Sequence, residues 1–193
     1  MTKAELRSEL RKTRREHVEA QPGSIRALLF HRPPASLLDL IAPDAVIGLY
    51  HAGPFEAPAA AYAGFFAERG HAIALPHFTD REAAMAFREH SDPFGASDLV
   101  PGPFGPLQPA GEPEIMVPDV VFVPLIGFNE RCERLGQGGG HYDRWLAEHP
   151  GRVTIGLAWD AQRVEPASAL PVEEHDQRLD AVVTPTRIYL SED

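Results

Sequence analysis

Short apolar runs, separated by polar or glycine-containing segments, dominate the chain and predict buried β-strands. Five runs have the length of a buried strand. They are residues 45–50, 71–76, 120–126, 152–158 and 181–184. Between the first two runs, a helical pattern over residues 58–69 opens with Pro58 and closes at Gly70. A strand, a helix and a strand at this spacing predict a parallel pair with a right-handed crossover.

The first 20 residues have a different pattern, typical of a polar helix with a thin apolar stripe. The stripe consists of Leu6, Leu10 and Val18. Four basic residues recur at spacings of four, four and three and therefore share one helical face. They are Lys3, Arg7, Arg11 and Arg14. Taken alone, the pattern favours a solvated face, balanced by nearby glutamates.

Two further segments shape the predicted organisation. Residues 25–40 indicate a helix that is interrupted at Pro33 and Pro34. Residues 91–118 are rich in proline and glycine and exceed an ordinary connection in length. Because the strand pattern resumes directly at Asp119, we expect this segment to cross the active-site face. The whole chain, residues 1–193, predicts a single three-layer α/β domain with a mostly parallel central sheet and ligands beyond the carboxyl ends of its strands.

Composition and charge narrow the class of protein. The net charge of −10 argues against a nucleic-acid partner, which normally meets a basic face. The only cysteine, Cys132, excludes an internal disulfide and a cysteine-based zinc site. No apolar run approaches the roughly 18 residues that span a bilayer, and no signal-peptide core follows the N-terminus. We therefore expect a cytoplasmic protein with no membrane partner, acting as a monomer on small molecules.

Folding alone explains the glycine-rich segment Arg134–Arg144 poorly. It reads R-L-G-Q-G-G-G-H-Y-D-R, between the apolar run 120–126 and a helical pattern over residues 142–148. A strand, a glycine loop and a helix can point backbone N–H groups and a positive helix end at a phosphate. The order of residues matches neither a Walker A loop nor a dinucleotide fingerprint. The alternative is a tight connection without a ligand.

Charged residues near this loop favour the phosphate interpretation. Arg134 suits bidentate contacts to phosphate, and Asp143 is the usual type of ligand for Mg²⁺. Asp176 could share the metal if it approaches Asp143 in space. Glu56 follows the first strand, where it could contact a substrate or stabilise the N-terminus of the next helix. No G-x-S-x-G elbow is present, and Cys132 is expected to be a buried thiol.

Six motifs in order resemble the 5-formyltetrahydrofolate cyclo-ligase family over nearly the whole chain. The first two are K-x-x-x-R at Lys3–Arg7 and a strand that ends near a glutamate at Tyr50–Glu56. V-P-x-x-x-F follows at Val123–Phe128, and then the glycine-rich segment Arg134–Arg144. G-L-A-x-D-x-Q lies at Gly156–Gln162 and L-P-x-x-x-H-D at Leu170–Asp176.

This resemblance implies a Rossmann-like fold of the NagB/RpiA/CoA transferase type. It also implies ATP- and Mg²⁺-dependent cyclisation of 5-formyltetrahydrofolate to 5,10-methenyltetrahydrofolate. The implied ATP contacts are Lys3, Ala4, Glu5, Leu6, Arg7, Arg134, Leu135, Gly136, Gln137, Gly138, Gly139, Gly140, His141 and Tyr142. The implied folate contacts are His51, Glu56, Gln137, Gly138, Gly139, Gly140 and His141. The implied metal ligands are Asp143 and Asp176, and the implied catalytic residues are Arg134 and Asp143.

Three positions depart from the family pattern. Family members usually have aspartate at Asn129, glycine at Cys132 and tyrosine at His141. These departures keep open a non-catalytic paralogue that binds folate or a nucleotide. A second alternative is an enzyme of the sugar-phosphate isomerase-like α/β group, which ATP-independent activity on a phosphosugar would distinguish.

Overall fold

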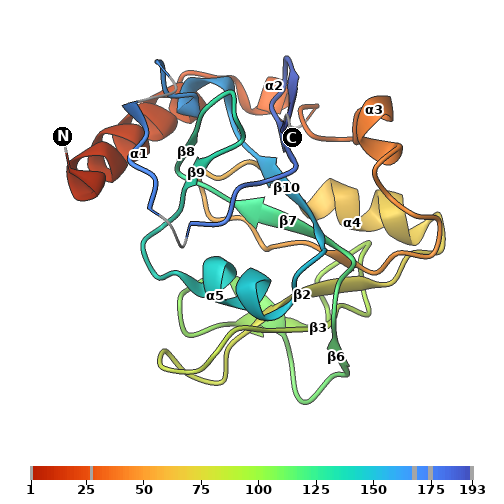
Figure 1. Ribbon diagram of the computed structural model, residues 1–193. Coiled ribbons are helices and arrows are strands. Elements are labelled where there is room, and N and C mark those ends of the chain that lie inside the picture. Colours follow the sequence, from red (N-terminus) through yellow and green to blue (C-terminus); the bar gives the residue numbers. More distant parts are fainter. Residues whose placement is uncertain (1, 27, 167–168, 174–175, 192–193) are drawn as a thin grey trace.

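The computed structural model describes residues 2–26, 28–166, 169–173 and 176–191. An eight-stranded sheet forms its centre (Figure 1). In spatial order the strands are β12 (Ile188–Leu190), β11 (Ala181–Val183), β10 (Val153–Leu157), β7 (Val120–Pro124), β1 (Ile47–Gly48), β2 (Ile73–His77), β3 (Ala86–Glu89) and β6 (Ile115–Met116).

The five central strands are parallel and correspond to the five predicted runs. β11, β10, β7, β1 and β2 pair in parallel, whereas β12, β3 and β6 join the two ends antiparallel. This confirms an α/β fold with a mostly parallel sheet. The sequence did not reveal the three outer strands. They are short and partly exposed, as at Ile115 and Leu190, and so lack a continuous apolar run.

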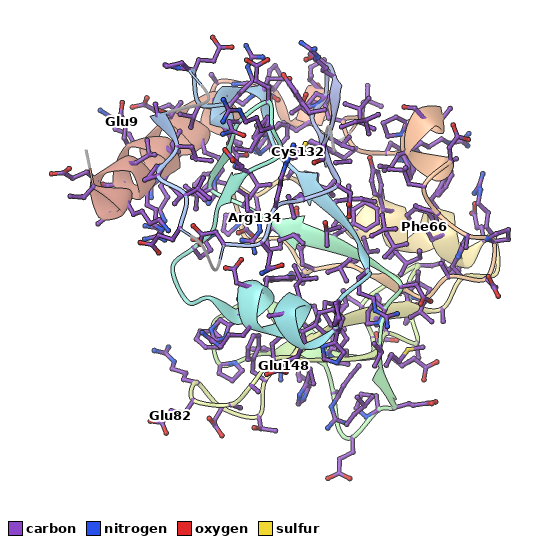
Figure 2. All side chains as sticks on the ribbon, viewed as in Figure 1. Glu9, Phe66, Glu82, Cys132, Arg134 and Glu148 are labelled. Atoms are coloured by element: carbon purple, nitrogen blue, oxygen red, sulfur yellow. The ribbon has the colours of Figure 1, made fainter. Side chains whose placement is uncertain are left out.

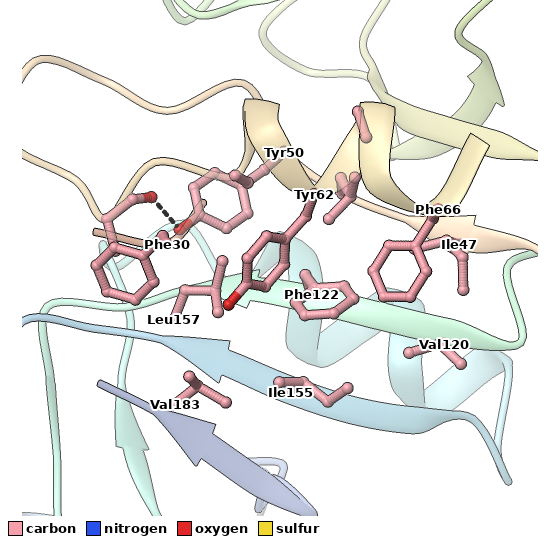
Figure 3. Packing of buried hydrophobic residues seen from close by; sticks show 14 of the residues in the cluster. Phe30, Ile47, Tyr50, Tyr62, Phe66, Val120, Phe122, Ile155, Leu157 and Val183 are labelled. Carbon is pink, nitrogen blue, oxygen red and sulfur yellow. Dashed lines mark hydrogen bonds between the residues drawn. The ribbon is translucent and has the colours of Figure 1, made fainter. Parts of the chain in front are cut away.

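Alternate residues of the central strands pack into two hydrophobic clusters, one on each face of the sheet. Phe122 and Ile155 pack with α4 (Ala60–Ala67), where Tyr62 and Phe66 cover the sheet (Figure 3). Val121, Val123 and Val182 instead pack with α5 (His141–Glu148), through Trp145 and Leu146. The two helices therefore enclose the sheet as the outer layers of a three-layer structure.

The N-terminal helix α1 (Lys3–Glu19) confirms the first predicted element. The helix expected over residues 25–40 is wrong, because the described residues of this range form only two short helical turns, α2 (Gly23–Arg26) and α3 (Ala35–Leu38). Pro58 also does not open the helix, which begins at Ala60. Gly70 does close it, with a left-handed φ of +88°. None of the described helices combines the length and apolarity needed to cross a bilayer.

Two hairpins outside the main sheet complete the structure. One, β8 (Gly127–Phe128) with β9 (Arg134–Leu135), separates β7 from the glycine-rich loop. The strand that leads into the glycine loop is therefore β9, and the loop is followed by α5, in the expected order of strand, glycine loop and helix. The other, β4 (Leu99–Pro101) with β5 (Leu107–Pro109), lies in the segment 91–118, together with the edge strand β6. A direct connection from β3 to β7 would need far fewer residues than the segment 91–118 contains.

Candidate functional site

A cavity of about 1230 Å³ opens at the carboxyl ends of the parallel strands. Tyr50 follows β1, Pro76 lies in β2 and Pro124 ends β7, and all three line the cavity. The remaining walls come from α1, the β4–β5 hairpin, the glycine-rich loop and the segment around Asp176. Ligands of parallel α/β sheets bind at this edge, so the cavity is the candidate site.

The glycine-rich loop contributes one wall, and its glycines adopt conformations that other residues disfavour. Gly138 has a φ of +109°, and Gly140, the residue before α5, has a φ of +65°. Arg7 Nε donates to the carbonyl oxygen of Gly136 at 2.9 Å. Arg11 Nη2 donates to both the backbone oxygen and Oε1 of Gln137, each at 3.1 Å. Two arginines of α1 therefore hold the loop against the helix.

The packing of α1 directs its basic face toward the cavity. Leu6 and Leu10 of its apolar stripe join a separate cluster with Ile126, Leu135, Val164 and Leu170, whereas Val18 joins the main core. Gly127 permits the close approach, since a Cβ there would lie 2.5 Å from Leu10 Cδ1. Lys3, Arg7 and Arg14 line the cavity, whereas Glu9 points outward (Figure 2). The solvated-face interpretation is therefore wrong for the cavity-lining cations.

Each carboxylate that was assigned to a metal is paired with a cation that was assigned to phosphate. Asp143 Oδ1 lies 2.6 Å from Nη2 of Arg134, a residue in the interior of the molecule (Figure 2). Burial lowers the pKa of Arg134, while Asp143 and Asp176 raise it. Lys3 Nζ contacts Asp176 Oδ2 at 2.7 Å and Glu173 Oε2 at 2.9 Å. Lys3 and Arg134 are therefore neutralised by protein carboxylates, whereas Arg7 lines the same cavity and donates to a backbone oxygen.

The donor set fits a magnesium ion that also binds substrate oxygens. Arg134 and the backbone N–H of Gln177 both donate to Oδ1 of Asp143, and no described residue donates a hydrogen bond to Oδ2. Mg²⁺ commonly takes one or two carboxylates and completes its shell with phosphate oxygens and water. Among the described residues no three His, Cys, Asp or Glu side chains group as a metal site. Glu174 and His175 lie outside the described residues.

Glu56 is the best-held carboxylate of the opposite wall. Its Oε2 accepts from Gly53 N at 2.8 Å, and its Oε1 accepts from Gln137 Nε2 at 2.9 Å. The alternative role at a helix terminus is wrong, because the first turn of α4 contains no acidic residue. Gln137 joins the glycine-rich loop directly to Glu56, so the loop and this wall meet inside one cavity.

His51 lies beside Glu56 on the cavity wall. Its Nδ1 is buried and has no hydrogen-bond partner among the described residues. Burial lowers the pKa of His51, and His90 lowers it further, whereas Glu56 raises it. A neutral imidazole with an unpartnered nitrogen is suited to accept from, or donate to, a ligand.

Three rings form an aromatic wall that the sequence predicted only in part. Phe78, Phe104 and His141 pack with centroid distances of 4.9, 4.9 and 5.1 Å, and all three line the cavity. Gln108 fixes the hairpin, because its amide exchanges hydrogen bonds with both the N–H and the C=O of Phe78. Such a wall suits a flat aromatic ligand. The Phe-Gly-Pro sequence at the tip of the hairpin, residues 104–106, was the feature of the sequence that could have indicated Phe104 as part of this wall.

The cavity gathers most of the predicted residues. Lys3, Arg7, His51, Glu56, every residue from Arg134 to Asp143, and Asp176 line it. Three implied ATP contacts do not: Leu6 is in the core, and Ala4 and Glu5 are exposed, with Glu5 in a capping box with Thr2. Sequence reasoning missed Arg14, Tyr50, Phe78, Phe104 and Glu173 as cavity residues.

Comparison with known proteins decides the family. A model of the 5-formyltetrahydrofolate cyclo-ligase family matches residues 1–185. The chain belongs to the 5-formyltetrahydrofolate cyclo-ligase family. It is 48% identical over 73 residues to the 5-formyltetrahydrofolate cyclo-ligase of Escherichia coli K12. That matched segment covers 37% of this chain and spans 38% of the length of the relative.

Two solved structures of 5,10-methenyltetrahydrofolate synthetases have a similar fold. The one from Aquifex aeolicus has a TM-score of 0.74 at 24% identity and covers 100% of this chain and 94% of its own. The one from Mycoplasma pneumoniae has a TM-score of 0.66 at 21% identity and covers 94% of this chain and 98% of its own. These similarities show that the chain has the same α/β fold as both proteins.

The structure accommodates the departures from the family pattern. Cys132 has a φ of +59°, in the region that favours the glycine usual in the family, and its side chain is fully buried. Burial raises the pKa of its thiol to about 11. Asn129 accepts from the backbone N–H groups of Arg131 and Glu133, which an aspartate could equally do. His141 keeps a planar ring in the aromatic wall.

Proposed function

We propose that this protein cyclises 5-formyltetrahydrofolate to 5,10-methenyltetrahydrofolate, with consumption of ATP and release of ADP and phosphate. One observation carries the proposal: a single cavity joins a cationic, glycine-lined half to an aromatic half beside Glu56. We call these the phosphate half and the ring half. The phosphate half comprises Lys3, Arg7, residues 134–140, Asp143 and Asp176. The ring half comprises His51, Glu56, Phe78, Phe104 and His141.

In the phosphate half, the triphosphate of ATP replaces protein carboxylates as the partner of the cations. Lys3 and Arg134 are each paired with an aspartate in the free protein. A bound phosphate offers the same cations oxygen acceptors of higher charge. Asp143 and Asp176 are then available to hold Mg²⁺, which would neutralise charge on the phosphate oxygens. Arg7 and the glycine-rich loop complete the cradle.

In the ring half, the reduced folate lies against the aromatic wall. Phe78, Phe104 and His141 supply flat apolar surface for a conjugated ring. The Glu56 carboxylate accepts hydrogen bonds from N–H groups on the edge of the pterin. Gln137, which contacts Glu56 at 2.9 Å, places the glycine-rich loop where the two ligands meet.

The proposed chemistry consists of two displacements. The formyl oxygen on N5 attacks the γ-phosphorus of ATP, and ADP leaves. N10 then attacks the activated formyl carbon and loses its proton to solvent, and phosphate departs with the former formyl oxygen, which leaves the N5–C–N10 bridge of the methenyl product. Such a reaction needs positioning and charge neutralisation rather than a protein nucleophile. This agrees with a cavity lined by cations, carboxylates and glycines.

A spectrophotometric assay tests the proposal. The protein is mixed with 5-formyltetrahydrofolate, ATP and Mg²⁺, and the absorbance of the methenyl product is followed. We expect a rise that needs all three components. Calorimetric binding of folate and nucleotide without any product at high protein concentration would favour the non-catalytic paralogue. Turnover of a phosphosugar without ATP would instead favour the isomerase-like alternative.

A further inference from the structure

Arg14 occupies a position on α1 that the helix otherwise reserves for apolar residues. The buried residues of α1 are Leu6, Leu10, Arg14 and Val18, spaced four apart. The side chain of Arg14 is only 9% exposed. Burying a guanidinium is costly unless it is paired and hydrogen-bonded, so a leucine here would stabilise the helix packing more simply.

The contacts of Arg14 only partly offset this cost. Its Nη1 donates to the carbonyl oxygen of Leu125 at 3.4 Å and lies 3.9 Å from Glu56 Oε1. Its Nε is buried without a hydrogen-bond partner among the described residues. Burial lowers the pKa of Arg14 and Arg11 also lowers it, whereas Glu56 and Tyr50 raise it. A poorly satisfied buried charge on a cavity wall indicates a role in function rather than in stability.

Glu56 is the acidic group that faces this charge. Its other partners, Gly53 N and Gln137 Nε2, are neutral donors. Its side chain is 14% exposed, so solvent screens the attraction of Arg14 only weakly. The positive charge of Arg14 therefore lies beside the Glu56 carboxylate of the ring half.

We propose that Arg14 is a positioning residue, whose buried guanidinium fixes the Glu56 carboxylate toward substrate edges that present N–H donors. The pterin edge of a reduced folate has such donors, so the inference rests on the proposed function. The same helix then serves both halves of the cavity. Lys3 and Arg7 line the phosphate half, and Arg14 orients Glu56 in the ring half.

Binding of 5-formyltetrahydrofolate to the full-length protein, measured by calorimetry without ATP, tests this inference. Arg14→Met keeps the length and apolar stem of the side chain and removes its charge. We expect a loss of folate affinity of about 10- to 30-fold, at or below the low end for a truncated buried charge pair, because Arg14 and Glu56 lie 3.9 Å apart. Affinity for ATP with Mg²⁺ should change less than about twofold. Lys12→Met, a loss of charge at an exposed position of the same helix, should leave both affinities unchanged.

A double-mutant cycle separates positioning from a merely structural role. Glu56→Gln should weaken folate binding by itself. In that background, Arg14→Met should add less than about a twofold effect, because the group it positions is already neutral. The double variant leaves no buried charge unpaired, so its melting temperature should equal or exceed that of the wild-type protein. If Arg14→Met alone does not fold, comparison of the double variant with Glu56→Gln provides the test.

The outcomes separate this inference from the proposed function. Equal folate affinity of the wild type and Arg14→Met would overturn this inference alone. Additive losses in the cycle, or equal losses of folate and nucleotide affinity, would also overturn it. A wild-type protein that binds no 5-formyltetrahydrofolate would overturn the proposed function and this inference together.

Discussion

The two halves of the cavity are held in opposite ways. In the phosphate half both metal-assigned carboxylates are paired with cations, Asp176 with Lys3 and Asp143 with Arg134, while Arg7 donates to the backbone oxygen of Gly136. In the ring half the three rings are held by packing, with 44% of Phe104 exposed, and the hydrogen bonds that hold Glu56 come from neutral donors. His51 Nδ1 there is buried without a described partner. A ligand must exchange partners in one half and cover surface in the other.

This difference has an energetic consequence. Entry of a phosphate into its half breaks existing ion pairs, so the net gain is smaller than the charges alone suggest. Entry of a ring into the other half removes apolar surface from water and breaks no described ion pair. We therefore expect a substitution in one half to change the affinity for the ligand of that half and to leave the affinity for the other ligand nearly unchanged.

The largest expected effect is at Asp143. Asp143→Asn keeps an acceptor for Arg134 but removes the negative charge that would hold the metal. We expect the turnover number to fall at least about 100-fold, because charge stabilisation of the transferred phosphoryl group is lost. Folate affinity, measured by calorimetry, should stay within about twofold. Glu148→Gln, an exposed change on the same helix, is the control. Full activity of Asp143→Asn would refute the metal assignment.

A smaller effect is expected on the other side of the cavity. Phe104→Ala removes the exposed ring of the aromatic wall, and stacking contacts of this kind contribute roughly 1–3 kcal/mol. The KM for 5-formyltetrahydrofolate should rise about tenfold, and the KM for ATP should not change. Phe94→Ala is a matched control, because Phe94 is 69% exposed in the same segment and does not line the cavity. Similar kinetics in both variants would remove the aromatic wall from the site.

Lys3→Met should produce a moderate change confined to the phosphate half. In the free protein the ammonium group already has two carboxylate partners, which bound nucleotide must replace. Removing the ammonium therefore costs less nucleotide-binding free energy than its contact with phosphate alone would suggest. We expect about a fivefold rise in the KM for ATP, smaller than the full value of a charge-assisted hydrogen bond. The KM for folate should be unchanged. An equal rise in both would show that the halves are not separate.

The smallest effect concerns stability and pH. Because burial lowers the pKa of His51, the unfolded chain binds the proton more readily than the folded protein. The stability gained from the neutral imidazole is present above the ordinary pKa of 6.5 and is lost as the pH falls below it. The melting temperature of His51→Gln should therefore fall less than that of the wild type between pH 7.5 and 5.5. An identical fall in both proteins would contradict a buried, neutral His51.

The phosphate half could largely be predicted from the sequence, as could His51, Glu56 and His141 of the ring half, whereas the two phenylalanines of the ring half could not. Residues 134–143 are contiguous, and their glycines signal left-handed backbone, as Gly138 and Gly140 show. Phe78 and Phe104 meet His141 only because the hairpin folds back over the sheet. Nothing local to Phe78 distinguishes it from a core residue, and for Phe104 the only sign is the Gly105-Pro106 pair that follows it.

The same contrast applies to the fold. The five buried parallel strands are continuous apolar runs and were all predicted. The outer strands depend on pairing with neighbours rather than on their own pattern. Arg14 shows the limit most clearly, since its spacing matches both the basic face and the buried stripe of α1. Only the packing of the helix decides between them.

The central claim is that one cavity holds both ligands at once. Calorimetric titration of 5-formyltetrahydrofolate into protein saturated with Mg²⁺ and a non-hydrolysable ATP analogue tests this claim directly. We predict one-to-one binding with an affinity at least as high as without the nucleotide, because each ligand occupies its own half. Folate affinity that falls in proportion to the concentration of the nucleotide would show that the two compete for one place and would contradict the account.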